Sequence, residues 1–160
     1  MSTADAPLPT PPRVPGVAPY VLIVRAPYYV DVVDGLRDGA VRILDGARTR
    51  HEVLDVAGAL ELAPAIRFAV AGFRHFDAYV ALGCVVRGET DHYDHVCREA
   101  MSGLTQVALM QGLALGNGLL TVDTVEQARA RSALDGFNKG AEAAVAALKQ
   151  VIAARWLGRA

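Results

Sequence analysis

The sequence predicts an α/β domain in which a parallel sheet of four strands is covered by helices on both faces. Short apolar runs rich in β-branched residues alternate with longer segments in which apolar residues recur every three or four positions. Such alternation is typical of parallel strands joined by right-handed helical crossovers. Only 6% of the residues are aromatic, so small aliphatic side chains must form the core, and these suit helices packed on a buried parallel sheet.

Four apolar runs are expected to be strands. The first contains β-branched residues and stops at Pro27, the second alternates between apolar and polar residues, and the third is the most strand-like run in the chain. Runs of this length bounded by turn residues are typical of buried strands. The strands are expected at residues 20–26, 50–56, 77–88 and 118–123.

Five segments have the apolar spacing of amphipathic helices. Pro64 falls within the first turns of the second, where a proline is better tolerated than in the middle. Thr124 and Gln127 form a capping-box pattern at the start of the fourth. The helices are expected at residues 31–48, 59–73, 92–113, from 124 onward, and 138–156.

The domain is expected to comprise residues 20–160, preceded by a tail of residues 1–19. The tail holds six of the eight prolines, which exclude a helix or a central strand: Pro7, Pro9, Pro11, Pro12, Pro15 and Pro19. The two cysteines, Cys84 and Cys97, are too few for a disulfide framework, and we expect both to be small buried hydrophobic residues.

Charge and hydropathy exclude several classes of function. The formal net charge is −1 and no basic stripe is present, so nucleic acid is not an expected partner. No apolar stretch is long enough to span a membrane, and no secretory signal is visible, so cytoplasmic residence is the default expectation. His92 and His95 lie three apart without an evident third ligand, so no metal site is expected.

The segment GCVVRGETDHYDHV at 83–96 is the strongest candidate for chemistry. A predicted strand ends before Gly88, and a helix is expected to begin near His92. Ligands of parallel sheets bind beyond the carboxyl ends of the strands, and a helix start presents free N–H groups to an anion. The helix dipole favours a neutral imidazole at this position, able to give or take a proton. From the residues alone, however, a single histidine at a helix start is more often structural.

The same segment, extended to residue 104, closely resembles the core signature of 6,7-dimethyl-8-ribityllumazine synthases. GALE at 58–61 resembles the turn after the second strand of that family, and LTVDTVEQARARS with FNKGAEAAVAAL, within 120–148, resembles its C-terminal strand and helices. The resemblance runs from about residue 21 to residue 148. It implies a flavodoxin-like three-layer sandwich.

The resemblance assigns catalysis to two residues, His92 as the general acid and base and Arg131 as the partner of the substrate phosphate. It also assigns Gly88, Glu89 and Thr90 to phosphate binding. A guanidinium binds phosphate in a fork geometry. Without the resemblance, the preferred interpretation of Arg131 is a solvated cation near a helix C-terminus.

The remaining implied site residues bind the pyrimidinedione and its ribityl chain: Tyr28, Gly58, Ala59, Glu61, Val85, Val86 and Asn117. Tyr28 is the stacking aromatic of this set. Lys139 and Glu142 match supporting positions near the site. The ordinary explanations are a loop anchor for Tyr28, a helix-start carboxylate for Glu61 and strand core for the two valines. Three positions depart from the family pattern: Tyr29 replaces a usual asparagine, Ala57 a common proline, and Asn117 a frequent phenylalanine contributed by a neighbouring subunit.

The resemblance further implies a reaction without metal or organic cofactor. 5-Amino-6-(D-ribitylamino)uracil and L-3,4-dihydroxybutan-2-one 4-phosphate are the two implied substrates, condensed to 6,7-dimethyl-8-ribityllumazine with release of phosphate and water. Family members form pentamers, and many assemble sixty subunits into a capsid. The bend at 133–140 departs from that of capsid formers, so the larger assembly is left open.

Other partners and functions also stay open. Riboflavin synthase is a candidate partner, and the N-terminal segment could add a strand to a neighbour's sheet. The alternatives to catalysis are a carrier of lumazine or flavin, a shell protein on the same fold, and a flavodoxin-like module for another phosphorylated ligand.

Overall fold

The computed structural model describes residues 8–158. Four strands and five α-helices follow one another as β1 (Tyr20–Ala26), α1 (Val30–Gly46), β2 (Arg50–Asp55), the short 3-10 helix η1 (Ala59–Glu61), α2 (Leu62–Ala71), β3 (Ala78–Val86), α3 (His92–Gln111), β4 (Leu115–Val122), α4 (Val125–Ser132) and α5 (Lys139–Trp156). No helix in this part of the chain is long and apolar enough to cross a membrane.

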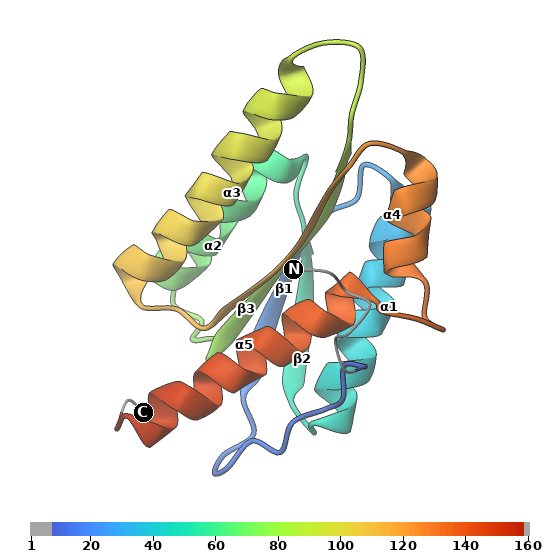
Figure 1. Ribbon diagram of the computed structural model, residues 1–160. Helices are drawn as coiled ribbons and strands as arrows, with labels where there is room; N and C mark the ends of the chain where they lie inside the picture. The colour runs from blue at the N-terminus through green and yellow to red at the C-terminus, as the bar shows by residue number, and fades with distance from the viewer. Residues whose placement is uncertain (1–7, 159–160) are drawn as a thin grey trace.

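The sheet has the order β2-β1-β3-β4, and all three strand pairs are parallel. Helices α2 and α3 cover one face, and α1, α4 and α5 cover the other (Figure 1). This order and layering confirm the predicted flavodoxin-like three-layer fold. The carboxyl ends of the strands therefore meet at one edge of the sheet.

The core lies on both faces of the two central strands. Val21, Ile23, Val80 and Leu82 face α1 and α5. The alternate residues, among them Leu22, Val24 and Ala81, face α2 and α3. Because successive side chains of a strand point to opposite faces, both faces are buried, which explains why these strands read as continuous apolar runs.

The edge strand β2 differs from the central strands. Val53 and Leu54 are 43% and 42% exposed, although both are apolar. An exposed apolar edge strand can pair with another chain. The edge at β2 is therefore a candidate contact between subunits.

The strand predicted at 118–123 is wrong at its start, because β4 begins at Leu115. The sequence Gly116-Asn117-Gly118 favours a turn, but here it is extended. A Cβ at Gly116 would lie 1.9 Å from the carbonyl oxygen of Ala143 on α5. The glycine thus allows α5 to pack directly on the strand.

Two helix starts also refine the predictions. The helix expected at 59–73 is divided into η1 and α2 and ends at Ala71. At α4, the Thr124 hydroxyl accepts a hydrogen bond from the Gln127 N–H at 3.2 Å, as the capping pattern predicts. The Gln127 side chain instead accepts from the N–H of Asp123, one residue earlier than a capping box requires.

The described part of the proline-rich segment packs on its own chain. Pro11 fills the space over Gly46. The Arg155 guanidinium of α5 donates to the carbonyls of Pro15 and Val17, at 2.5 and 2.9 Å. Residues 1–7, including Pro7, lie outside the described residues, and pairing of the segment with a neighbouring sheet stays a prediction.

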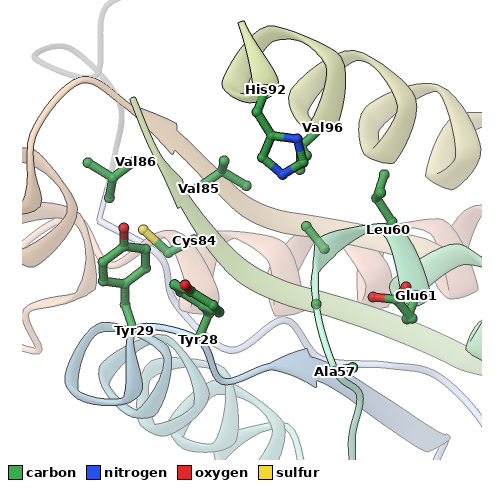
Figure 2. A pocket seen from close by; sticks show the side chains of 12 residues that line it. Tyr28, Tyr29, Ala57, Leu60, Glu61, Cys84, Val85, Val86, His92 and Val96 are labelled. Atoms are coloured by element: carbon green, nitrogen blue, oxygen red, sulfur yellow. The ribbon is translucent and has the colours of Figure 1, made fainter. Parts of the chain in front are cut away.

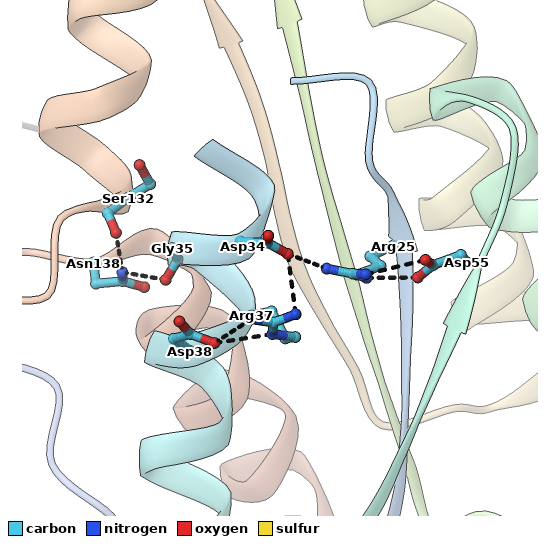
Figure 3. Close-up of polar contacts among 8 residues, drawn as sticks. All are labelled: Arg25, Asp34, Gly35, Arg37, Asp38, Asp55, Ser132 and Asn138. Carbon is cyan, nitrogen blue, oxygen red and sulfur yellow. Dashed lines mark hydrogen bonds and ion pairs between the residues drawn. The ribbon is translucent and has the colours of Figure 1, made fainter. Parts of the chain in front are cut away.

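Two polar clusters hold the helices near the carboxyl edge (Figure 3). Arg25 of β1 donates a fork to the Asp55 carboxylate at 2.5 and 3.0 Å and also pairs with Asp34 of α1. Asn138, fully buried, donates to the carbonyls of Gly35 and Ser132 at 2.9 and 2.7 Å. A buried, satisfied polar group such as Asn138 fixes the relative positions of the elements that it joins.

Candidate active site

A pocket of about 430 Å³ opens at the carboxyl edge of the sheet. Its walls come from the loop after β1, the loop after β2, the end of β3 and the first turns of α3 (Figure 2). The volume falls in the range of small-molecule sites. Three of the four strand ends that the sequence indicates therefore form the pocket, whereas the end of β4 does not line it.

The loop after β1 contributes two aromatic rings. Tyr28 and Tyr29 meet edge to face, with ring centroids 5.4 Å apart. Tyr28 is 77% exposed, so its ring is accessible to a flat ligand. The Tyr28 N–H donates to the Ala26 carbonyl at 2.9 Å, which turns the chain sharply at the end of the strand. An exposed aromatic face of this kind can stack on a heteroaromatic ring.

The loop after β2 supplies the pocket's only carboxylate among the described residues, that of Glu61. Glu61 lies in η1, and its N–H donates to the Gly58 carbonyl at 3.2 Å. A Cβ at Gly58 would lie 3.0 Å from the Glu61 carboxylate. Gly58 thus leaves room for this acceptor, and Ala59 also lines the pocket.

The end of β3 forms the floor with Cys84, Val85 and Val86. Burial raises the pKa of the Cys84 thiol to about 11, and the negative charge of Asp31 acts in the same direction. The thiol is therefore neutral at physiological pH and contributes apolar surface. Cys84 is buried as predicted, but Cys97 is only half-buried, which corrects the prediction for that residue.

The first turns of α3 close the opposite wall. The His92 side chain points from the helix start toward Val85 (Figure 2). Val96 lines the pocket one turn further on, because residues four apart share a helix face. An imidazole and a carboxylate thus face one cavity.

The turn at residues 88–91 joins β3 to α3, and none of its residues lines the pocket. We call it the phosphate turn, after the role that the family resemblance implies for it. Gly88, Glu89 and Thr90 are exposed. Within residues 8–158, the side chains of Glu89 and Thr90 make no hydrogen bond. The turn leads directly into the N-terminus of a 20-residue helix, where backbone N–H groups and the dipole favour an anion.

Arg131 does not reach this pocket within one chain. It lies on α4, where its guanidinium donates to the Gln127 carbonyl of the same helix at 3.0 Å. Since α4 packs on the face with α1 and α5, whereas α3 covers the other face, the helices that carry His92 and Arg131 lie on opposite faces of the sheet (Figure 1).

Like the predicted residues of the 88–91 turn, three predicted residues on β4 and α5 lie outside the pocket. The Asn117 side chain on β4 accepts from the Leu119 N–H at 3.0 Å, and its amide lies 3.0 Å from the Met101 sulfur. Lys139 and Glu142 form an ion pair of 2.7 Å in the first turn of α5. The structure therefore separates the predicted site into a pocket set and a set on other surfaces.

Sequence reasoning omitted several residues that line the pocket, chiefly Tyr29, Leu60, Cys84 and Val96. Val96 could have been found from its spacing of four residues from His92. Leu60 lies inside the GALE motif between residues that were included. Tyr29 also carried a signal, because it stands where the resembled family usually has an asparagine. Cys84 carried none, since it also fits an ordinary core position.

The fold and the pocket together define a doubly wound α/β protein with a pocket of small-molecule size at the carboxyl edge of a parallel sheet. The family model of 6,7-dimethyl-8-ribityllumazine synthase matches residues 19–155. A protein with that name from Nitrobacter winogradskyi is 46% identical over 144 residues, which cover 88% of each chain. A 6,7-dimethyl-8-ribityllumazine synthase 1 from Rhizobium meliloti is 43% identical over 143 residues, covering 87% of this chain and 94% of the relative. The chain belongs to the 6,7-dimethyl-8-ribityllumazine synthase family, a family of transferases in riboflavin biosynthesis.

Proposed function

We propose that this protein condenses 5-amino-6-(D-ribitylamino)uracil with L-3,4-dihydroxybutan-2-one 4-phosphate to form 6,7-dimethyl-8-ribityllumazine, phosphate and two molecules of water. The observation that carries the proposal is the convergence of Tyr28, Glu61 and His92 on one pocket at the carboxyl edge. These side chains supply a stacking face, a polyol acceptor and a proton carrier. Their chemistry fits a ribitylated pyrimidine beside a reacting ketone.

The bound pyrimidine would stack on Tyr28, with its edge against Val85 and Val86 and its ribityl hydroxyls on Glu61 and the backbone of Gly58 and Ala59. Its 5-amino group then faces the second substrate near His92. Holding two reactants in one pocket replaces a bimolecular encounter, which lowers the entropic part of the barrier.

The reaction begins with attack of the 5-amino group on the ketone and loss of water to give an imine. Proton removal from the adjacent carbon then expels phosphate, and ring closure by the ribitylamino nitrogen releases the second water. Each step moves a proton, which the imidazole of His92 can carry. The phosphate turn would hold the phosphate before and after the C–O bond breaks.

Arg131 would come from a neighbouring subunit. The helices that carry His92 and Arg131, α3 and α4, cover opposite faces of the sheet in one chain, so we infer that a shared phosphate is bound by two copies. Asn117, Lys139 and Glu142, which also lie outside the pocket, would accompany Arg131. The exposed apolar residues Val53 and Leu54 give β2 a surface for such assembly. A pentameric ring is the proposed assembly; riboflavin synthase as a partner and cytoplasmic residence also remain proposals.

The first test mixes both substrates with the purified protein and records lumazine fluorescence. His92→Ala is expected to lower kcat roughly 10- to 100-fold, at or below the lower end of general acid–base effects, because water can replace part of the proton transfer. His95→Ala is the matched control, since His95 lies on the same helix but does not line the pocket. Absence of product with the wild-type protein would refute the proposed function.

The second test asks whether the site is shared between subunits. The Arg131→Ala variant is expected to lose activity mainly when the concentration of the sugar phosphate is limiting. Subunits carrying His92→Ala and subunits carrying Arg131→Ala, co-assembled in equal amounts, should regain activity in about one quarter of the sites, since each donor is intact with a probability of about one half. A site confined to one chain would show no recovery.

A further inference from the structure

Arg87 occupies the junction between β3, β4 and α3, one residue before the phosphate turn. Its N–H donates to the Val122 carbonyl at 2.9 Å and extends the pairing of β3 with β4. Its guanidinium Nε donates to Asp123, directly after β4, at 3.1 Å. The side chain therefore extends from the end of one strand to the end of the next.

The same guanidinium also binds the first turn of α3. Nη1 and Nη2 donate to the two carboxylate oxygens of Asp94 at 3.3 and 3.2 Å. The guanidinium carbon lies 4.1 Å from the centroid of the Tyr93 ring. A fork on a carboxylate and a stacked ring together fix both the position and the plane of the guanidinium.

These contacts surround the residues that the proposed reaction needs. Arg87 is held at one end of the phosphate turn, and Tyr93 and Asp94 directly follow His92 at the other. Within residues 8–158, the side chains of Glu89 and Thr90 form no hydrogen bond that could hold the turn. The placement of the turn therefore depends on what fixes its two ends.

Arg87 itself is poorly suited to bind the substrate phosphate. One guanidinium faces two carboxylates, those of Asp94 and Asp123, so the cluster carries net negative charge. The side chain of Arg87 is 46% exposed, so each ion pair by itself adds little to stability. The main effect of the cluster is therefore to fix the relative positions of the ends of β3 and β4 and the first turn of α3.

We propose that Arg87 is a positioning residue that sets the phosphate turn and the His92 imidazole relative to the pocket. This inference rests on the proposed function for its kinetic consequences, but not for its structural one. A displacement of about 1 Å in reacting groups can reduce a rate about a hundredfold. The pyrimidine subsite, formed by Tyr28, Glu61 and Val85, does not contact Arg87 and should be unaffected.

The kinetic experiment compares Arg87→Gln and Arg87→Lys with the wild-type protein at matched oligomeric state. Arg87→Gln is expected to lower kcat about tenfold or more and to raise the KM for the sugar phosphate by a similar factor, with the KM for the pyrimidine within about twofold. Arg87→Lys should resemble Arg87→Gln, because an ammonium group keeps the charge but cannot span both carboxylates in a planar fork.

Arg74→Gln is the matched control. Arg74 also pairs with a carboxylate, that of Glu52, and lies 5.4 Å from the Phe76 ring, but at the opposite edge of the sheet. Hydrogen–deuterium exchange supplies a readout without substrate. In both Arg87 variants, the backbone amides of residues 88–95 should exchange faster than in the wild type, and those of residues 20–26 should exchange at the wild-type rate. In Arg74→Gln, the exchange rates of residues 88–95 should not change.

The outcomes separate this inference from the proposed function. A wild-type protein that makes no lumazine refutes the function, while faster exchange at residues 88–95 still supports the positioning role. An active wild type with Arg87→Gln unchanged in both KM values and in exchange refutes the inference alone. Full activity of Arg87→Lys would show that a positive charge is sufficient at this position. A loss of kcat with both KM values unchanged and faster exchange throughout the chain would indicate general destabilisation. Either result overturns the inference that Arg87 is a positioning residue.

Discussion

Replacing Asn138 by alanine should destabilise the fold more than any other single amide change in the described chain. This side chain is fully buried. Its carbonyl oxygen caps α5 by accepting the Ala141 N–H at 2.9 Å. Its amide nitrogen donates to the carbonyls of Gly35 on α1 and Ser132 on α4. One residue therefore joins three helices, as Figure 3 shows for two of these contacts.

The magnitude follows from these hydrogen bonds. Loss of an N-cap costs about 1 kcal/mol. A buried carbonyl left without a donor costs about 1–3 kcal/mol. Asn138→Ala leaves the Ser132 carbonyl in that state, whereas the Gly35 carbonyl, inside α1, keeps the N–H donor of its own helix. The expected loss in the free energy of unfolding is therefore about 2–4 kcal/mol, toward the lower end if water reaches the vacated space.

Two companion variants make the reasoning specific. Asn138→Asp keeps the shape and the cap but places a carboxylate against two carbonyl oxygens. Its neutral form can donate, so its pKa should be raised, and the stability it retains should be largest at low pH and lost as pH rises toward 7. A Cβ at Gly39 would lie 2.0 Å from the Asn138 carbonyl oxygen. Gly39→Ala should therefore be destabilising in the wild type and much less so when combined with Asn138→Ala.

Urea unfolding followed by circular dichroism, at one fixed protein concentration because assembly contributes to stability, measures all of these variants. A loss below about 1 kcal/mol for Asn138→Ala would mean that the Ser132 carbonyl finds another donor. Strict additivity of Gly39→Ala with Asn138→Ala would show that the close approach of the two residues is not what requires the glycine.

Two further predictions concern the sheet and the pocket. Gly116→Ala should lower the free energy of unfolding by about 2–3 kcal/mol or more, because its Cβ would lie 1.9 Å from the backbone of Ala143. Gly136→Ala is the control, because the space around Gly136 is open, and it should change the free energy of unfolding by less than about 0.5 kcal/mol. Equal effects of the two variants in urea unfolding would contradict this packing. In a Cys97→Ser background, alkylation of Cys84 by iodoacetamide should keep accelerating up to about pH 11, because the thiolate is the reactive form and burial raises its pKa to about 11. A rate that is half-maximal near the ordinary value of 9.0 would refute the burial of that thiol.

The pocket was predictable wherever chain order and strand ends determine it. Residues 58–61 follow β2, and 85–86 end β3 before His92 begins α3, so the topology of a parallel sheet brings them to one edge. Arg131 has the same local signature as many solvated helix arginines. Nothing along the chain states on which face of the sheet α4 packs, and that face decides whether one chain or two must form the site.

By itself, the sequence determined the alternation of strands and helices, the capping of α4 by Thr124 and the edge of the sheet at which ligands bind. These follow from local periodicity and from the direction of parallel strands, which are properties of contiguous residues. Only the tertiary structure decided that Gly116 lies in a strand, that Asn138 joins three helices, and that the Arg87 guanidinium contacts both Asp123 and Asp94. Each of these depends on contacts between residues distant in sequence, and the free energy of such contacts is set by packing geometry that no local pattern encodes.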